Sequence, residues 1–180
     1  MKAKNIADFK PSFNTKLFLD TNIWLYLYYP QNTTVAKQII DNYSNAFDEI
    51  LSKKCLIVTD MIQMSELINL VLRIEFRAYT NDKVNISFKE YRETTSYIEA
   101  LANAKTLSLN ILKSATLRSG IFNAEELKTM VDNCDQADFN DIYFANFCFK
   151  ENAIIITHDY DFNAINTKIE LYTLNNKYLN

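Results

Sequence analysis

Four carboxylic acids, far apart along the chain, lie where short apolar runs give way to polar sequence. They are Asp20, Glu66, Asp141 and Asp159. In a parallel sheet the carboxyl ends of the strands share one edge, and α/β proteins place their chemistry at that edge. Carboxylates that meet there repel one another unless a cation lies between them. The pattern therefore predicts that the four acids form one site and that the site binds a divalent metal ion.

The types of ligand favour a hard metal ion over zinc. Carboxylate oxygens without support from histidine or cysteine select magnesium, with manganese as the other option. The only histidine, His158, is adjacent to Asp159, and we interpret it as a structural residue. Asp161 comes two residues after Asp159, so it is a further candidate ligand.

Each acid also has a purely local interpretation. Asp20 would be the N-cap of the helix that follows it, and Glu66 an exposed residue at the margin of an apolar stripe. Asp138 would cap a helix in which Asp141 lies near the positive end of the helix dipole. Asp161 would cap a short helical turn. The sequence leaves open whether Asp138 or Asp141 supplies the third acid.

Two polar neighbours are expected to support the acids, with Asp138 as a third supporting residue. Asn22 is close enough in sequence to Asp20 to hold its carboxylate in place or to terminate the turn. Thr157 lies between a run of isoleucines and Asp159, where a strand ends. These residues are therefore expected at the same edge of the sheet as the acids.

The apolar periodicity predicts strands that alternate with helices, typical of a three-layer α/β/α sandwich with a mostly parallel sheet. Strands are indicated at 16–19, 55–59, 153–157 and 169–174, and helices at 21–28, 35–50, from 61 onward, 123–131 and 142–149. Residues 78–122 form a predicted helical insertion, with one helix around Phe88–Leu101 and another over Leu107–Leu117. We expect a single domain over residues 1–180.

Composition indicates a soluble protein of the cytoplasm. The chain has 180 residues, 48% hydrophobic, and a formal net charge of -3, which disfavours a globally basic nucleic-acid binder. Three scattered cysteines are typical of reduced thiols, and no apolar run has the length of a signal peptide or a membrane span. With a single glycine, asparagines are expected to take over at turns and helix caps.

In their order along the chain, the acidic runs resemble the motif set of PIN-domain ribonucleases. The similarity covers residues 16–162 and rests on four runs: Leu19-Asp20-Thr21-Asn22, Ser65-Glu66-Leu67, Asp141-Ile142-Tyr143-Phe144-Ala145 and Thr157-His158-Asp159-Tyr160-Asp161-Phe162. Among PIN proteins the chain is most similar to bacterial VapC-type toxins. It departs from them in length, with the extra residues between Arg77 and Asn123.

The resemblance implies a PIN-like fold and a magnesium-dependent endoribonuclease. By the same resemblance Asp20, Glu66, Asp141 and Asp159 would be the catalytic and metal-binding acids, with Asp161 a fifth ligand. It also implies an antitoxin protein as a partner, and a homodimer. Such a nuclease would be inert in a chelator, because the metal-free acids repel both each other and the RNA backbone.

RNA binding needs cations away from the acids, because phosphate contacts dominate affinity. All four arginines of the chain lie in its middle part: Arg73, Arg77, Arg92 and Arg118. They are the candidate RNA contacts. Judged singly, each is better explained as part of an ordinary solvated helix face.

Other functions remain open from the sequence. Phosphatases that use an aspartate nucleophile need a second aspartate two residues later, where this chain has Asn22. A receiver domain needs a lysine soon after a late strand, and none follows Ile156 closely. Three PIN-like alternatives are kept: an RNA-processing nuclease that is not a toxin, a nuclease for single-stranded DNA, and a catalytically silent binding module.

Overall fold

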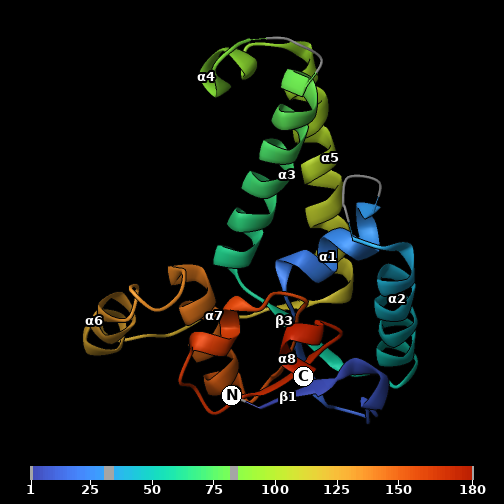
Figure 1. Ribbon diagram of the computed structural model, residues 1–180, viewed down its shortest axis with the longest axis vertical. Helices are drawn as coiled ribbons and strands as arrows, with labels where there is room; N and C mark the ends of the chain where they lie inside the picture. The colour runs from blue at the N-terminus through green and yellow to red at the C-terminus, as the bar shows by residue number, and fades with distance from the viewer. Residues whose placement is uncertain (1, 31–34, 82–84, 180) are drawn as a thin grey trace.

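A parallel sheet runs through the computed structural model, which describes residues 2–30, 35–81 and 85–179 (Figure 1). In these residues it has six strands in the order β1-β6-β5-β2-β3-β4, and every strand pair is parallel. The strands are β1 (Lys2–Asn5), β2 (Lys16–Leu19), β3 (Leu56–Thr59), β4 (Thr116–Leu117), β5 (Ile154–Ile156) and β6 (Glu170–Thr173). The three central strands, β5, β2 and β3, therefore end side by side at one edge.

Helices cover both faces of this sheet. They are α1 (Thr21–Tyr28), α2 (Lys37–Ser52), α3 (Met61–Asn81), α4 (Phe88–Tyr91), α5 (Thr95–Ser114), α6 (Ala124–Asp132), α7 (Phe139–Glu151) and α8 (Asn176–Leu179), with 3-10 turns η1 (Ile6–Asp8) and η3 (Asp161–Ala164). Leu17 and Leu19 of β2 pack into a core with α1, α2, α3 and α5. Phe18 packs into a second core with α6 and α7. Because successive strand residues face opposite sides, the fold is the predicted three-layer α/β/α sandwich.

The long helices α3 and α5 lie side by side and rise away from the sheet as an arm, with α4 at its tip (Figure 1). Tyr91 of α4 is almost fully buried. Its ring centroid lies 5.3 Å from that of Phe76 and 5.2 Å from that of Tyr79, both on α3. An aromatic cluster thus closes the tip. Although these two helices are long, no helix in the described ranges combines the length and apolarity needed to span a membrane.

Most predicted elements are present, and the insertion shows the main difference. Strand 16–19 and helix 21–28 begin and end as predicted. The predicted break between Leu101 and Leu107 is wrong: after the short helix α4, α5 is one unbroken helix of 20 residues, because no glycine or proline interrupts it and Ala104, Leu107 and Ile111 keep helical spacing in the core. Thr116 and Leu117 pair with β3 as an edge strand rather than extending a helix.

Candidate active site

Asp20 follows β2 at the carboxyl edge of the sheet and is held there by three hydrogen bonds. Its Oδ1 accepts from the Thr21 backbone N–H at 2.7 Å. Its Oδ2 accepts from Asn22 Nδ2 at 2.6 Å and from the Thr157 hydroxyl at 2.5 Å. The residue is the N-cap of α1 and is only 5% exposed. Its capping role and its place in the site are therefore compatible.

Thr157 and Asn22 link the ends of the neighbouring strands β2 and β5. The Thr157 hydroxyl accepts from Asn22 Nδ2 at 3.2 Å and from the Asp159 backbone N–H at 2.9 Å. Asn22 Oδ1 accepts from the His158 backbone N–H at 3.2 Å. These bonds fix the loop that carries Asp159 relative to Asp20. Asn22 and Thr157, two of the three residues predicted to support the acids, thus contact Asp20 directly.

Glu66 reaches the same edge from the second turn of α3. Its Oε2 accepts from the Thr21 hydroxyl at 2.8 Å, and the Asn140 side chain is near enough to oppose the rise of the Glu66 pKa that burial causes. Glu66 is half-buried rather than exposed at the margin of its helix. The sequence analysis did not identify Thr21 or Asn140, although each lies beside a predicted acid.

The start of α7 separates the roles of Asp138 and Asp141. Asp138 is exposed and caps the helix, since its Oδ1 accepts from the Asn140 backbone N–H at 3.0 Å. Asp141 is partly buried in the first turn, and the charges of Asp20, Asp159, Asp138 and Glu66 all raise its pKa. The buried position and the acidic neighbours favour Asp141 as the third acid.

Burial and the neighbouring carboxylates raise the pKa values of three of the acids. Burial, with the charges of Glu66 and Asp159 adding to it, raises the pKa of Asp20 to about 7, despite opposing hydrogen bonds from Thr157 and Thr21. Burial and acidic neighbours raise the pKa of Asp141 to about 8. Burial also raises the pKa of Glu66, with help from the charges of Asp138 and Asp159. The four predicted acids therefore share one electrostatic environment.

The donor set suits a hard divalent cation in its chemistry, but the ligands are not preassembled. The four carboxylates offer only oxygen atoms, and a cation would relieve the repulsion among them, which adds to the burial that raises the pKa values of Asp20, Glu66 and Asp141. Within the described ranges, however, no three Asp, Glu, His or Cys side chains are grouped closely enough to hold a metal ion as they stand. Binding one ion in common therefore requires some of these side chains to move.

Asp161 and His158 lie at the margin of the site. The Asp161 backbone N–H donates to Asp159 Oδ1 at 3.1 Å, and its own side chain is exposed. The prediction that Asp161 caps the helical turn was wrong, because Tyr160 is the N-cap and makes no side-chain bond. His158 Nδ1 lies 3.1 Å from the Tyr43 hydroxyl, and burial lowers the pKa of the ring. It packs as a structural residue.

A buried polar network connects the strand ends near the acids. Asp60 caps α3 by accepting from the Gln63 backbone N–H at 2.9 Å, and it also accepts a hydrogen bond from the Tyr143 hydroxyl. Gln63 accepts from the Thr59 hydroxyl and donates to the Leu19 carbonyl, both at 2.7 Å. Since Leu19 precedes Asp20, this network fixes β2, β3, α3 and α7 relative to each other.

All four candidate RNA-binding arginines are exposed, and the structure places them apart. Arg73 and Arg77 lie on α3 itself. Arg92 follows α4 at the tip of the arm, with its guanidinium carbon 6.0 Å from the Tyr97 ring centroid. Arg118 follows β4, and its backbone N–H donates to the Thr59 carbonyl at 2.8 Å. The structure therefore does not gather the four into one patch.

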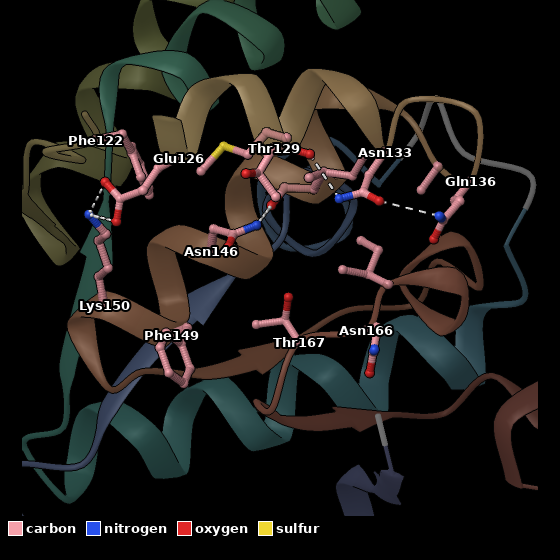
Figure 2. Close-up of a pocket in the computed structure, with 14 residues that line it drawn as sticks. Phe122, Glu126, Thr129, Asn133, Gln136, Asn146, Phe149, Lys150, Asn166 and Thr167 are labelled. Carbon is pink, nitrogen blue, oxygen red and sulfur yellow. Dashed lines mark hydrogen bonds and ion pairs between the residues drawn. The ribbon is translucent and has the colours of Figure 1, made fainter. Parts of the chain in front are cut away.

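A pocket of about 340 Å³ lies away from the acids, between α6, α7 and the segment before β6 (Figure 2). Phe122 and Phe149 contribute apolar surface to it, and Asn146 reaches it from α7. Lys150 Nζ lies 2.8 Å from a Glu126 carboxylate oxygen and 4.4 Å from the Phe122 ring centroid. None of the four predicted acids lines this pocket, so it is separate from the candidate active site.

Comparison with known proteins identifies the family. The sequence matches the PIN domain over residues 17–168, whereas no curated protein matches it. The solved structure of VapBC2 from Rickettsia felis, bound to a DNA fragment from its promoter, aligns with a TM-score of 0.54 and 17% identity, covering 88% of this chain and 98% of the other. PAE2754 from Pyrobaculum aerophilum aligns at 0.45 and 13%, covering 92% and 93%. Because the PIN match spans most of its length, the chain belongs to the PIN domain family.

Proposed function

We propose that this protein is a metal-dependent endoribonuclease that hydrolyses phosphodiester bonds in RNA with magnesium, or manganese, as its cofactor. PIN domains are generally nucleases, and all four acids of the motif set are present in this chain. One observation supports the proposal above the others. Asp20, which is buried, and Asp141, which is partly buried, come from distant parts of the sequence and lie beside other carboxylates, so that burial and these charges raise their pKa values to about 7 and about 8.

In this proposal Asp20, Glu66, Asp141 and Asp159 hold the metal, and Asp161 lies close enough in the chain to assist. A bound divalent cation supplies positive charge beside the scissile phosphate and lowers the pKa of an attacking water. The residues around the acids restrict their motion. Thr157 and Asn22 hold the Asp20 carboxylate from two sides, so only its remaining lone pairs are free for a ligand. Asp138 contributes by capping α7.

The proton balance of the site makes cation binding depend on pH. Without a cation, Asp141 with a pKa of about 8 holds a proton through much of the neutral range. A metal ion needs the carboxylate form, so binding releases protons and tightens as the pH rises. Protons therefore neutralise the acids in the metal-free site, and the cation does so when it is bound. The proposal predicts an activity that increases from mildly acidic to mildly alkaline pH.

We further propose that the protein acts in the cytoplasm as the toxin of a toxin–antitoxin pair. The fold resembles that of VapBC2, and this part of the proposal rests on that likeness and on the motif order. An exposed apolar face on α5 supports a protein partner: Ile98, Leu109 and Leu112 are exposed on one side of the helix, 66%, 60% and 43% respectively. Such a face is a candidate contact for an antitoxin or for the second copy of a homodimer.

A cleavage experiment tests the proposal. Mixed cellular RNAs are incubated with the protein in Mg²⁺, with and without EDTA, beside Asp20→Asn and the matched control Asp48→Asn on the exposed face of α2. We expect cleavage by the wild type and by Asp48→Asn, and none in EDTA or with Asp20→Asn. Cleavage that persists in EDTA would contradict the metal mechanism.

The remaining outcomes separate the alternatives. Cleavage of single-stranded DNA but not RNA would identify a DNA nuclease. If neither nucleic acid is cut under any condition while the protein still binds one of them, the chain is a silent PIN-like binding module. Growth arrest on expression, relieved by a small protein encoded beside this gene, distinguishes the toxin from a nuclease of RNA processing.

A further inference from the structure

Arg73 and Arg77 share a face of α3 with the acid Glu66. An α-helix turns by about 100° per residue, so Arg73, seven residues after Glu66, lies within about 20° of the same direction. Arg77, eleven residues after Glu66, lies within about 20° on the other side. With a rise of 1.5 Å per residue, the two arginines follow Glu66 at about 10 Å and about 16 Å along the axis.

The opposite face of α3 is occupied by packing. Leu67 and Val71 are fully buried in the core shared with α1, α2 and α5. Glu75 accepts a hydrogen bond from Tyr29 of the loop after α1. The helix therefore cannot rotate to hide the arginines, and both remain exposed along the part of α3 that rises from the sheet (Figure 1).

The charges on this face are not neutralised within the described ranges. The three ion pairs found there all use lysines, namely Lys4, Lys16 and Lys150, and none involves an arginine. Arg73 and Arg77 are both exposed. Two cations without an acidic partner, one helical turn apart, form a ready contact for an anionic chain. Their spacing from Glu66 means that such a chain would run into the acidic site.

We infer that Arg73 and Arg77 form a track on α3 that binds the phosphate backbone of single-stranded RNA and leads it to the acids. The inference rests on the proposed nuclease function, and it separates these two arginines from Arg92 and Arg118. Arg92 lies beyond the tip of the arm, where its guanidinium is placed over the Tyr97 ring. Arg118 lies past the edge strand β4. Neither continues the line that starts at Glu66.

Equilibrium binding at several salt concentrations tests the track. Fluorescence anisotropy of a labelled single-stranded RNA is measured in the Asp20→Asn background, so that no RNA is cut. The double variant Arg73→Gln/Arg77→Gln is compared with Lys53→Gln/Lys168→Gln, which removes the same charge. These lysines are exposed and precede β3 and β6, at the opposite edge of the sheet.

The expected change follows from counterion release. Each phosphate contact of a single strand contributes about 0.7 to the slope of log K against log salt, so losing two contacts lowers the slope by about 1.4. At about 0.1 M salt this corresponds to binding weaker by about 25-fold. Arg73→Lys/Arg77→Lys should keep the slope, because it keeps both charges. An equal loss in the lysine control, or an unchanged slope in the arginine variant, would overturn the inference.

Cleavage assays with the two double variants in the Asp20 wild-type background keep this inference distinct from the nuclease proposal. The arginine variant should raise KM for a long RNA and leave cleavage of a dinucleotide, which is too short to reach Arg73, unchanged. If the wild type cuts no RNA but the salt slope still falls, the nuclease proposal fails and the track stands. If the wild type cuts RNA but the arginine variant binds RNA with an unchanged salt slope, only the inference about the track fails.

Discussion

Replacing Asp141 by asparagine should remove most of the pH dependence of stability in the metal-free protein. The pKa of Asp141 is about 8 in the folded protein and about 3.9 in an unfolded chain. The folded state therefore holds the proton more tightly, and this group favours folding fully only below about pH 3.9. Its contribution is lost as the pH rises toward 8 and beyond. The change from a carboxyl to an amide keeps the shape and removes this titration.

The magnitude follows from the raised pKa values. Between about pH 6 and about pH 9, a carboxyl with a pKa of 8 loses roughly 2–3 kcal/mol of its contribution to the free energy of unfolding. Asp20, with a pKa of about 7, loses roughly 1–2 kcal/mol over the same range. The wild type should therefore lose roughly 4 kcal/mol, whereas Asp141→Asn should lose only the share of Asp20.

Thermal unfolding followed by circular dichroism measures the difference. For a chain of this length, 1 kcal/mol corresponds to about 2–4 °C in Tm, so the wild type should lose about 5–10 °C more than the variant between the two pH values. The samples contain EDTA, and Asp48→Asn is the control for removing one exposed carboxylate. In a parallel series Mg²⁺ should restore the wild type at alkaline pH and have little effect on the variant.

Two results would refute this reasoning. A wild-type Tm that stays constant over the range in EDTA would show that the acids are not buried together. An equal pH dependence in Asp141→Asn would show that another group titrates. Because Mg²⁺ and protons compete for the same carboxylates, a stabilisation by Mg²⁺ that is independent of pH would place the cation elsewhere.

Three smaller changes test other parts of the structure. Thr157→Val removes the hydroxyl that donates to Asp20 at 2.5 Å, so it should cost roughly 1–3 kcal/mol in urea unfolding and shift the pH profile of cleavage upward. Gly120→Ala places a Cβ 2.3 Å from the Tyr143 hydroxyl oxygen and should cost about 1–3 kcal/mol, while Ser119→Ala beside it should be neutral. Asn152 ends α7 in the left-handed region, with φ 52°. Its replacement by alanine should lower the unfolding free energy by about 1 kcal/mol, and its replacement by glycine should not.

The sequence predicts the central strands well, because burial on both faces is the single physical cause of their apolar pattern. The strands β2, β3 and β5 are largely apolar on both faces because helices cover both sides, and each is followed directly by a polar residue. The prediction that asparagines replace glycine is confirmed at Asn14 and Asn152, two of the three non-glycine residues with positive φ among the residues that the structure describes. Strand β1 (Lys2–Asn5) was missed, since an edge strand needs little apolar character.

The residues of the site that were not predicted depend on tertiary contacts, which leave no local pattern in the sequence. The hydrogen bond from Thr21 to Glu66 joins residues 45 positions apart, and the one from Tyr143 to Asp60 spans 83. Nothing in the spacing of these residues distinguishes a buried partner from an ordinary one. The acids themselves could be predicted, because the rule that strand ends share an edge applies before any contact is known.

Helix α3 links the two halves of the proposed function. Glu66 near its start belongs to the acidic site, while Arg73 and Arg77 further along belong to the cationic track, so negative and positive charge follow one another along a single rigid element. RNA drawn to the arginines would reach the acids at the start of α3, where the proposed cleavage needs a bound cation. In EDTA the protein should therefore still bind RNA along α3 but should not cleave it at the edge of the sheet.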